Sequence, residues 1–405
     1  MPDGHTIFLV AILGALVLAW LGIFAFVVAT RAIYDVRKRV VDAARRAARR
    51  RIARAARAAD EVEVDRILGR LRVATLLRAA ADTSTRTPVA RVFARHLLRR
   101  AEPQIRALLE ARHERARWRR VAALRVAALA ELPEAAGLLR DAVGSPDADV
   151  SSAAIRILGE LETPQAQSVL VEALLEGSVA RSRVAAQLDG RAPLSVRTLA
   201  PLLEDGEPVV RYWGVKLLAR AAGDPAAADA LVVAAADGDA TVRAAAAESL
   251  GAESSELGTE TLIALLDDPS PVVRLHASRS LGRRGADGAA GLLAALLRDR
   301  DWWVRTAAKR ALERLGAAAT PAVAPLLRTD DEFARNSAAE VLQNLGLVRA
   351  LVDRVAAASS GDGEAAAAEL ALILDAGGER FASLALEHLD QAARNRVRET
   401  LKAVS

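Results

Sequence analysis

Hydrophobic and polar residues are arranged along this chain in a pattern that returns about every thirty residues. One copy reads acidic-x-x-Val-Arg-x-x-Ala-x-x-x-Leu, and the clearest copies run from Asp239 to Gly251, Ser270 to Gly282 and Asp301 to Leu312. The Val, Ala and Leu of a copy are spaced four residues apart, so they share one face of an α-helix. A fixed period of this length predicts an array of stacked repeats.

The arginine column shows how far the array extends. Its steps are 29 to 32 residues, and its nine positions are Arg91, Arg120, Ser151, Arg181, Arg211, Arg243, Arg274, Arg305 and Arg335. The residue three positions later is small in eight of the nine copies, and the residue seven positions later is Leu in eight. Small residues let neighbouring helices approach closely, and the Leu column supplies a continuous core. Each copy therefore predicts one helix of an antiparallel helical pair.

Polar residues and glycines at fixed places predict where these helices begin and end. The position four residues before the arginine suits an N-cap, because its side chain can accept from the free N–H groups of the first turn. The residues there are Asp147, Glu207, Asp239, Ser270, Asp301 and Asp331. Glycines near the other end predict left-handed C-caps at Gly159, Gly251, Gly282, Gly316 and Gly346.

These columns resemble HEAT repeats, and in particular the short type of about thirty residues named after phycobilisome lyases. The resemblance covers residues 61–350 and continues as a degenerate C-terminal repeat and cap over 351–405. It implies an all-α fold, an α-solenoid that forms a right-handed superhelix of roughly 9–11 helical hairpins. The unit from Leu170 to Gly190 is the least regular, because Gly177 stands in the acidic column.

The resemblance also implies a role for the acidic and arginine columns. In HEAT-like arrays such residues form a structural ladder, in which arginine bonds carboxylates or turn carbonyls of its own and adjacent units. A structural role is favoured here over a binding or catalytic site. The implied ladder residues are Arg211, Arg243, Arg274, Arg305, Arg335, Asp239, Asp301 and Asp331.

An uncharged apolar segment precedes the array. Residues 7–30 contain no charged side chain and would form a helix of about 36 Å, longer than the roughly 30 Å core of a bilayer. A cleaved signal peptide is the alternative, but the segment is long for one and no Lys or Arg precedes it. The sequence therefore predicts a retained transmembrane helix over 7–30, after a short extracytoplasmic N-terminus over 1–6.

A basic juxtamembrane segment over 31–60 follows. Residues 31–59 carry ten Arg and one Lys against two Asp, and the positive-inside rule places such a segment in the cytoplasm. We therefore expect a single-pass protein of the inner membrane with a cytoplasmic solenoid. The basic helix either only fixes the topology or also contacts anionic lipid headgroups. The candidate lipid-contacting residues are Arg37, Lys38, Arg45, Arg46, Arg49 and Arg50.

The net charge changes sign along the array, which bears on the class of partner. Residues 60–120 carry a net charge of +7, whereas residues 121–405 carry −10. Binding of nucleic acid needs a basic surface against the phosphates, so the acidic stretch argues against nucleic acid. We expect a protein partner together with the membrane contact.

Residues that usually carry catalysis are sparse. Cys is absent, and the five His residues stand at no metal-ligand spacing. Neither a Ser-His-Asp set nor a phosphate-binding glycine loop is recognisable. We therefore expect no enzymatic activity, no cofactor and no metal site.

Two adjacent aromatic pairs are candidates for a binding surface. Aromatic residues make up only 3% of the chain, and the pairs are Tyr212–Trp213 and Trp302–Trp303. In each pair, we expect one ring to pack in the core and the other to be exposed. Because Trp is favoured at the centre of protein interfaces, the candidate partner-binding residues are Trp213, Trp302 and Trp303.

Together, these features favour a bacterial membrane-anchored scaffold. The abundance of Ala and Arg, with only four Lys, is typical of a GC-rich bacterial genome. The solenoid would bind and position a partner protein at the inner membrane, since solenoids offer long binding surfaces. The general resemblance extends this role to envelope or polysaccharide machinery. Two alternatives stay open, a HEAT-like enzyme of the lyase type and a solenoid that binds nucleic acid.

Overall fold

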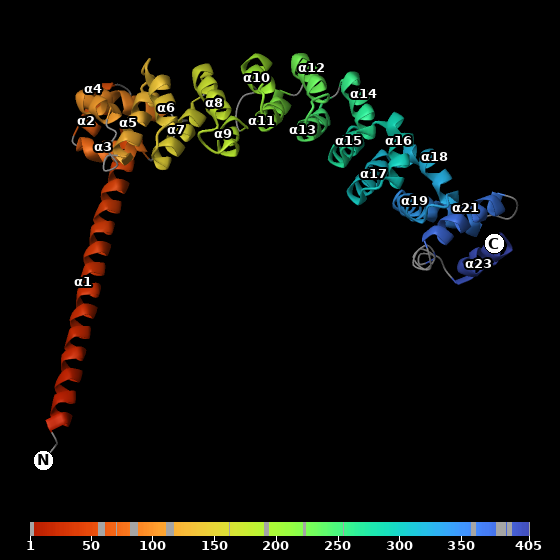
Figure 1. The fold of residues 1–405 in the computed structure, drawn as a ribbon, viewed down its shortest axis with the longest axis horizontal. Coiled ribbons are helices and arrows are strands. Elements are labelled where there is room, and N and C mark those ends of the chain that lie inside the picture. The colour runs from red at the N-terminus through yellow and green to blue at the C-terminus, as the bar shows by residue number, and fades with distance from the viewer. Residues whose placement is uncertain are drawn as a thin grey trace. The chain divides into compact units, whose positions relative to one another are not determined.

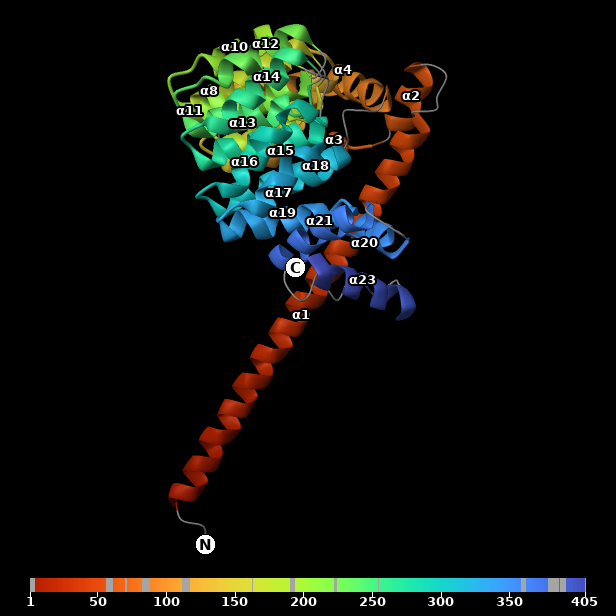
Figure 2. The ribbon, with the colours of Figure 1, turned by 90° about the vertical axis from the view of Figure 1, so that its right-hand side faces the viewer.

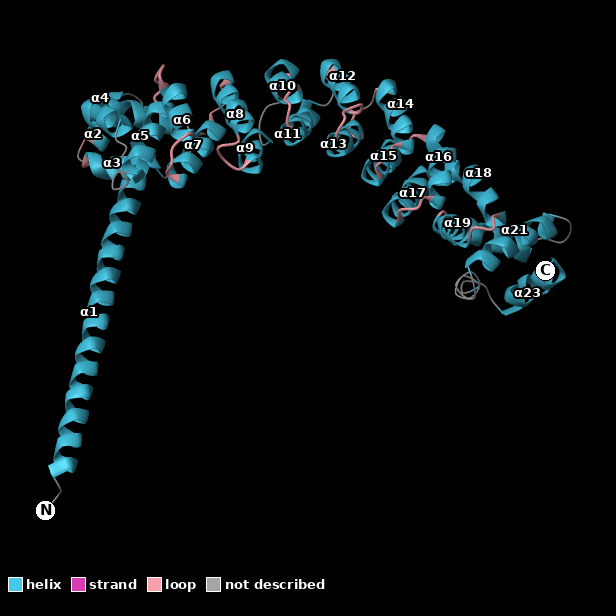
Figure 3. Ribbon diagram, in the orientation of Figure 1, coloured by secondary structure: helices cyan, strands magenta, loops and turns pink. Residues whose placement is uncertain are grey.

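The structure is a computed structural model, and every element that it describes is a helix (Figure 3). The described residues form two compact units, 1–173 with 178–180 and 174–177 with 181–405. The backbone is described for residues 4–55, 61–69, 71–81, 88–110, 117–161, 163–189, 194–221, 224–253, 255–357, 362–377, 386 and 391–404. The all-α fold that the sequence predicts is thus present in both units.

The first unit begins with one long helix, α1, which runs from Gly4 to Ala55 without a break (Figures 1 and 2). Its last residue, Ala55, is buried where α1 packs against α2, α3 and α4. One helix therefore contains the whole predicted apolar span and most of the predicted basic segment. The other helices of this unit are α2 (Glu61–Leu68), α3 (Val73–Ala81), α4 (Pro88–Glu110), α5 (Arg117–Leu129), α6 (Ala135–Val143) and α7 (Ala148–Glu160), and α8 (Pro164–Glu176) crosses the unit boundary.

The predicted transmembrane helix lies within α1. Among the described residues, no helix combines the length and the apolar character that crossing a membrane requires. The side chains of residues 4–19 lie outside the described part of the chain, and residues 7–19 of the predicted span are among them.

The second unit consists of helical pairs in two layers. The first helices of three repeats, α10, α12 and α14, lie in one layer, and the second helices α11, α13, α15 and α17 lie in the other (Figure 1). Each second helix packs against the next one along the chain. The helices are α9 (Arg181–Asp189), α10 (Val196–Leu203), α11 (Pro208–Leu218), α12 (Pro225–Ala234), α13 (Ala240–Leu250), α14 (Glu256–Ala264), α15 (Pro271–Arg284), α16 (Ala290–Ala295), α17 (Trp302–Leu315), α18 (Thr320–Val323), α19 (Glu332–Asn344), α20 (Leu347–Ala357), α21 (Asp362–Gly377) and α23 (Gln391–Val404).

The repeated apolar columns form the core, as the pattern predicts. In α13, the side chains of Val242, Ala246 and Leu250 are completely buried. The equivalent residues of α15 and α17 are buried to the same degree. Because these positions share one face of each second helix, stacking the helices joins them into one continuous core.

Three of the predicted left-handed C-caps are wrong, those at Gly159, Gly251 and Gly282. Gly159 and Gly282 lie inside α7 and α15, and Gly251 has a φ of −64°. Close helix packing explains glycine at position 282, because an added Cβ would lie 2.7 Å from the Cα of Ala311 in α17. A fourth, at Gly316, is wrong as well, because its φ of 66° goes with a ψ of −140°, outside the left-handed helical region. Gly346 does have a positive φ of 81°, which glycine adopts without strain.

Candidate functional site

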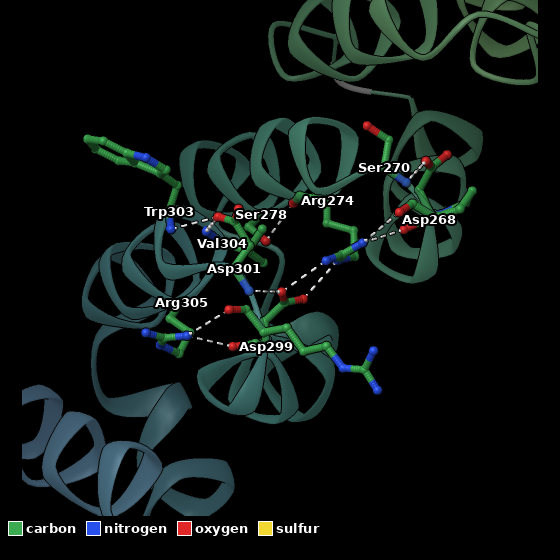
Figure 4. A network of polar contacts seen from close by, with 11 residues as sticks. Asp268, Ser270, Arg274, Ser278, Asp299, Asp301, Trp303, Val304 and Arg305 are labelled. Carbon is green, nitrogen blue, oxygen red and sulfur yellow. Dashed lines mark hydrogen bonds and ion pairs between the residues drawn. The ribbon is translucent and has the colours of Figure 1, made fainter.

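The arginine column forms a ladder of hydrogen bonds between consecutive repeats, and Arg274 in α15 shows its geometry (Figure 4). Nε and Nη2 of Arg274 donate to the two carboxylate oxygens of Asp299, at 2.8 and 2.9 Å. Nη1 donates to the backbone carbonyls of Asp268 and Pro269, at 2.8 and 3.2 Å. The guanidinium therefore joins the turn of its own repeat to the turn of the next.

Two preceding repeats have the same contacts. Arg211 pairs with Asp237 and Arg243 pairs with Asp268, each through Nε and Nη2 at 2.7 to 2.9 Å. Nη1 of both arginines donates to carbonyls of its own turn. Two parallel hydrogen bonds fix the guanidinium plane against the carboxylate. The three pairs link four consecutive repeats.

The ladder loses its carboxylate at Arg305. Nη1 of Arg305 donates to the carbonyls of Asp299 and Arg300, at 2.8 and 3.2 Å, like the other arginines. In the next repeat, however, Thr329 stands where the earlier repeats have an aspartate. Threonine has no carboxylate to accept two bonds, and the Arg305 guanidinium lies over the ring of Phe333, 5.6 Å from its centroid. Arg335 keeps one turn contact, to the carbonyl of Thr329 at 3.3 Å.

The aspartates that the sequence assigned to the ladder have another role. Asp239, Asp301 and Asp331 are N-caps, and each accepts hydrogen bonds from N–H groups in the first turn of its helix. The carboxylates that pair with the arginines lie two residues earlier in the repeat, at Asp237, Asp268 and Asp299. This second acidic column, six residues before Arg243, Arg274 and Arg305, is the signal in the sequence that marks these carboxylates as candidates.

The least regular repeat replaces the ladder with other contacts. Arg181 donates to the carbonyl of Leu174 at 3.0 Å and to the carboxylate of Glu207 at 3.1 Å. Gly177 has a φ of +65°, and an added Cβ would lie 2.8 Å from Nη2 of Arg181. Glu207 occupies the predicted N-cap position of α11, but its side chain makes no cap hydrogen bond, and its carboxylate pairs with Arg181 instead.

Two serines also depart from the columns. Ser151 stands in the arginine column, and its buried hydroxyl donates to the carbonyl of Val143 at 2.7 Å. Ser270 occupies the predicted N-cap position of α15, but its side chain makes no cap hydrogen bond. The backbone N–H of Ser270 donates to Asp268 at 2.8 Å, and the carboxylate of Asp268 therefore organises this turn.

The ladder carboxylates have lowered pKa values. The hydrogen bond from Arg211 is the main cause of the lowered pKa of Asp237. Burial by itself raises the pKa of Asp268 and Asp299, but hydrogen bonds from arginine and from a backbone N–H outweigh it, and both pKa values are lowered. The charged form of each carboxylate is therefore stabilised by the fold.

These pKa values predict destabilisation by acid. A lowered folded-state pKa contributes stability above the unfolded value, about 3.9 for Asp, and that contribution is lost as the pH falls through the folded value. The urea midpoint should therefore change little from about pH 7 to pH 5 and fall below about pH 4. In Asp299→Asn, the midpoint should be lower at neutral pH and should depend less on acid. A wild-type midpoint that stays constant down to about pH 3 would contradict this account.

The aromatic pairs differ from the prediction. Trp302 and Trp303 are both exposed, and their rings meet edge to face with centroids 4.6 Å apart. Tyr212 and Trp213 are both half-buried, with centroids 5.3 Å apart. The expectation that one ring of each pair packs in the core is therefore wrong. The reason in α17 is helical phase, since Val304 is fully buried and takes the core position of the first turn.

The candidate lipid-contacting residues lie along α1. Lys38, Arg46 and Arg50 are exposed. The side chains of Arg37, Arg45 and Arg49 lie outside the described part of the chain. The described members thus project from a helix surface that no other element covers at those positions.

Because Cys is absent, a metal ion would need His, Asp or Glu ligands among the described residues. Within them, no group of three or more His, Asp or Glu side chains is placed to hold a metal ion. His276 in α15 is half-buried, and burial is the main cause of its lowered pKa. This side chain is therefore neutral at pH 7.

Comparisons with known proteins support the repeat fold. The sequence profile described as HEAT repeats matches residues 196–263 and 259–343. No curated protein sequence matches the chain. Similar solved structures include an engineered protein, with 20% identity, a TM-score of 0.35 and coverage of 81% of this chain and 98% of that one.

Two further solved structures are also similar. A mutant of Kap121p has 13% identity and a TM-score of 0.46, over 85% of this chain and 46% of that one, so this chain spans less than half of its length. The complex of CpcE and CpcF of phycocyanin lyase from Nostoc sp. PCC7120 has 21% identity and a TM-score of 0.27, over 67% of this chain and 94% of that one. Likeness at this level carries no argument about activity. Residues 196–343 therefore match HEAT repeats, in agreement with the repeated columns and the ladder that this part of the chain contains.

Proposed function

We propose that this chain is a bacterial membrane-anchored scaffold whose HEAT repeats bind a partner protein and hold it at the inner membrane. A solenoid of stacked helical pairs suits this role, because it presents a long surface without needing a catalytic pocket. In this proposal the array binds its partner and does not transform it. The wider context, envelope or polysaccharide machinery, belongs to the same proposal and rests on general resemblance.

The observation that supports the proposed membrane anchor is the exposed apolar surface of α1. Trp20, Phe24 and Phe26 are exposed, and so are the apolar residues between and after them up to Val28. Successive residues of a helix point in different directions, so the apolar surface surrounds α1 on all sides. A helix that is apolar all round is stable inside a protein core or inside a membrane, and among the described elements none covers this stretch. The uncharged residues 7–19 would extend the same surface to the length of a bilayer core.

The basic half of α1 supports the proposed orientation. Exposed Lys38, Arg46 and Arg50 follow the apolar stretch on the same continuous helix. Each basic residue near an anionic leaflet contributes about 1 kcal/mol of attraction. Such a segment belongs on the cytoplasmic side, which places the repeats in the cytoplasm and the residues before position 7 outside it.

Removing residues 1–30 tests the anchor. The full chain should stay in membranes washed with alkaline carbonate, whereas the shortened chain should move to the soluble fraction. The deletion ends before Ala55, so the contact of α1 with α2 to α4 stays intact. A control with Lys38, Arg46 and Arg50 changed to Ser should remain in the membrane, because the apolar span is unchanged. Carbonate extraction of the full chain would contradict the anchor.

Crosslinking in the same membranes tests the scaffold. The full chain should give specific crosslinks to another protein, and the chain without residues 1–30 should lose those crosslinks at the membrane. A reporter enzyme fused after Ser405 should be active in the cytoplasm. Reporter activity in the periplasm would contradict the orientation, and a full chain that crosslinks to no protein would contradict the scaffold.

A further inference from the structure

One row of exposed apolar side chains follows the starts of the second helices. Four of its members stand two residues before the ladder arginines, and Trp302 stands one residue earlier. Their exposed fractions range from 46% to 71%. We call this row the apolar stripe, and its residues are Val209, Val272, Trp302, Trp303 and Phe333.

The stripe runs along the second unit and is interrupted once, in α13, by a polar residue. Its members lie on α11, α15, α17 and α19, and Thr241 holds the equivalent position in α13. Consecutive second helices pack against each other, so equivalent positions lie next to each other. The Arg305 guanidinium over the Phe333 ring joins the first turns of α17 and α19 directly. Single exposed apolar residues are ordinary, but a repeated row of them marks an interaction surface.

The side chains of the apolar stripe do not belong to the hydrophobic core. The residues that follow Val209, Val272, Trp303 and Phe333 are buried and supply the core contact of each turn, at Val210, Val273, Val304 and Ala334. The stripe side chain therefore points away from the neighbouring layer. In Figure 4, the ring of Trp303 points away from the polar network around Arg274. Two adjacent exposed Trp rings in this row are the kind of residue that dominates binding energy at protein interfaces.

The spacing of the stripe selects the conformation of what it binds. Packed helices have axes about 8–10 Å apart, so stripe positions on consecutive second helices are separated by about that distance. A β-strand repeats its side-chain direction every two residues, about 6.6 Å. A polyproline II helix repeats every three residues, about 9.3 Å, which matches the stripe. Aromatic surfaces are also the usual docking sites for proline-rich segments.

The charged residues beside the stripe indicate which residues the ligand has between its apolar positions. Exposed acidic side chains lie in the turns that precede the second helices, at Glu204, Glu207, Asp267 and Asp330, and at Glu332, the first residue of α19. The half-buried cap carboxylates Asp239, Asp301 and Asp331 lie in the same turns. Exposed arginines in these turns are fewer, at Arg298, Arg300 and Arg328. An acidic border favours a basic ligand, because complementary charge raises the association rate and suppresses wrong partners.

We propose that the apolar stripe binds a polyproline II segment of the partner protein, with an apolar residue at every third position and Arg or Lys between. This inference rests on the proposed scaffold function and adds the chemistry of its partner. Trp302, Trp303 and Phe333 form the centre of the surface. The acidic turns hold the basic residues of the segment along its edge.

A peptide titration tests the stripe. The probe is a fluorescently labelled peptide of about five Pro-Arg-Leu triplets, long enough to cross five second helices at about 9.3 Å per triplet. The full chain in detergent should bind it, and Trp303→Ala should weaken binding about tenfold or more. Phe333→Ala should weaken it as well. Val233→Ala is the matched control, because Val233 is 74% exposed on a first helix, α12, and this change should leave the dissociation constant unaltered.

Two further peptides test the chemistry of the ligand. Replacing Arg by Glu in each triplet should abolish measurable binding, and replacing Leu by Ser should weaken it about tenfold or more. Circular dichroism should show that each variant chain keeps its helix content. Equal binding by Trp303→Ala and the wild-type chain would overturn the inference, and so would equal binding of the Glu and Arg peptides.

Crosslinking separates failure of this inference from failure of the scaffold. If the double variant Trp303→Ala and Phe333→Ala leaves the membrane crosslinks to the partner unchanged, the inference about the stripe is overturned. The proposed scaffold function is then still supported. If these crosslinks disappear and the helix content is unchanged, the stripe is supported. Self-association of the full chain that depends on Trp303, without peptide binding, would identify a second copy as the occupant and overturn the inference.

Discussion

Arg274→Ala should lower the free energy of unfolding of the central repeats by about 3 kcal/mol. The change leaves Asp299 without the arginine that gives it two hydrogen bonds, and it removes the donor to the carbonyls of Asp268 and Pro269. The side chains of Arg274 and Asp299 are only 16% and 7% exposed, so water can replace the lost contacts only in part. Breaking a largely buried pair costs more than the pair itself contributes, because one charge remains buried.

Arg305→Ala is the matched control for this prediction. Arg305 makes the same turn-carbonyl contacts as Arg274 but lies over Phe333 in place of a carboxylate. Its loss should therefore cost about 1 kcal/mol, the usual contribution of a few hydrogen bonds and a cation–π contact. Arg274→Lys should fall between the two, because Lys keeps the charge but cannot make two parallel bonds. Urea titrations followed by circular dichroism give the three values, and equal losses in Arg274→Ala and Arg305→Ala would contradict the role of the carboxylate.

Gly282→Ala should destabilise the same repeats by about 1–3 kcal/mol, although alanine is the better helix former. An added Cβ would lie 2.7 Å from the Cα and 2.8 Å from the Cβ of Ala311. Those atoms belong to the backbone and the shortest side chain of α17, so neither can rotate away. The two helices must then separate, and the core between α15 and α17 loses contact.

Gly291→Ala is the control, and we expect its effect on stability to have the opposite sign. Gly291 lies in α16, and an added Cβ there would meet no atom within 4 Å. This change should stabilise the protein by about 0.5–1 kcal/mol, because alanine loses less backbone entropy than glycine in a helix. Thermal unfolding of both variants measures the difference in sign. A stabilised Gly282→Ala would show that α15 and α17 are less closely packed than the structure has them.

The core could be predicted because it depends on spacing within one helix. Val242, Ala246 and Leu250 repeat at helical intervals, and the same columns return in the following repeats. Burial of one such position therefore implies burial of its equivalents. No knowledge of how the repeats stack is needed for this inference, which is why the repeat fold follows from the sequence.

Which carboxylate pairs with each ladder arginine depends on how consecutive repeats stack. The residue pattern within one repeat does not reveal this stacking. Asp237 and Asp239 are both acidic and both near an arginine in sequence, but only the geometry between repeats decides which one accepts from Arg211. The same limit applies to Gly282, whose neighbour Ala311 comes from the next repeat. Its position near a helix end suggested a cap, although the helix continues.

The tryptophans show a different limit. The exposure of Trp302 and Trp303 follows from the phase of α17, in which Val304 takes the core position. A helical projection of the sequence contains this information. The general preference of Trp for partly buried positions favoured the wrong expectation, and a repeat that exposes both rings breaks that preference.

Thr329 divides the array into segments of unequal cooperativity. In a linear array, each repeat is held mainly by its nearest neighbours, so the strength of each interface sets how many repeats unfold together. The interfaces bridged by Arg211, Arg243 and Arg274 contain a carboxylate pair, and the interface bridged by Arg305 does not. The four repeats before this interface should therefore behave as one cooperative block, while the repeats after it exchange their amide hydrogens as a separate, less protected block.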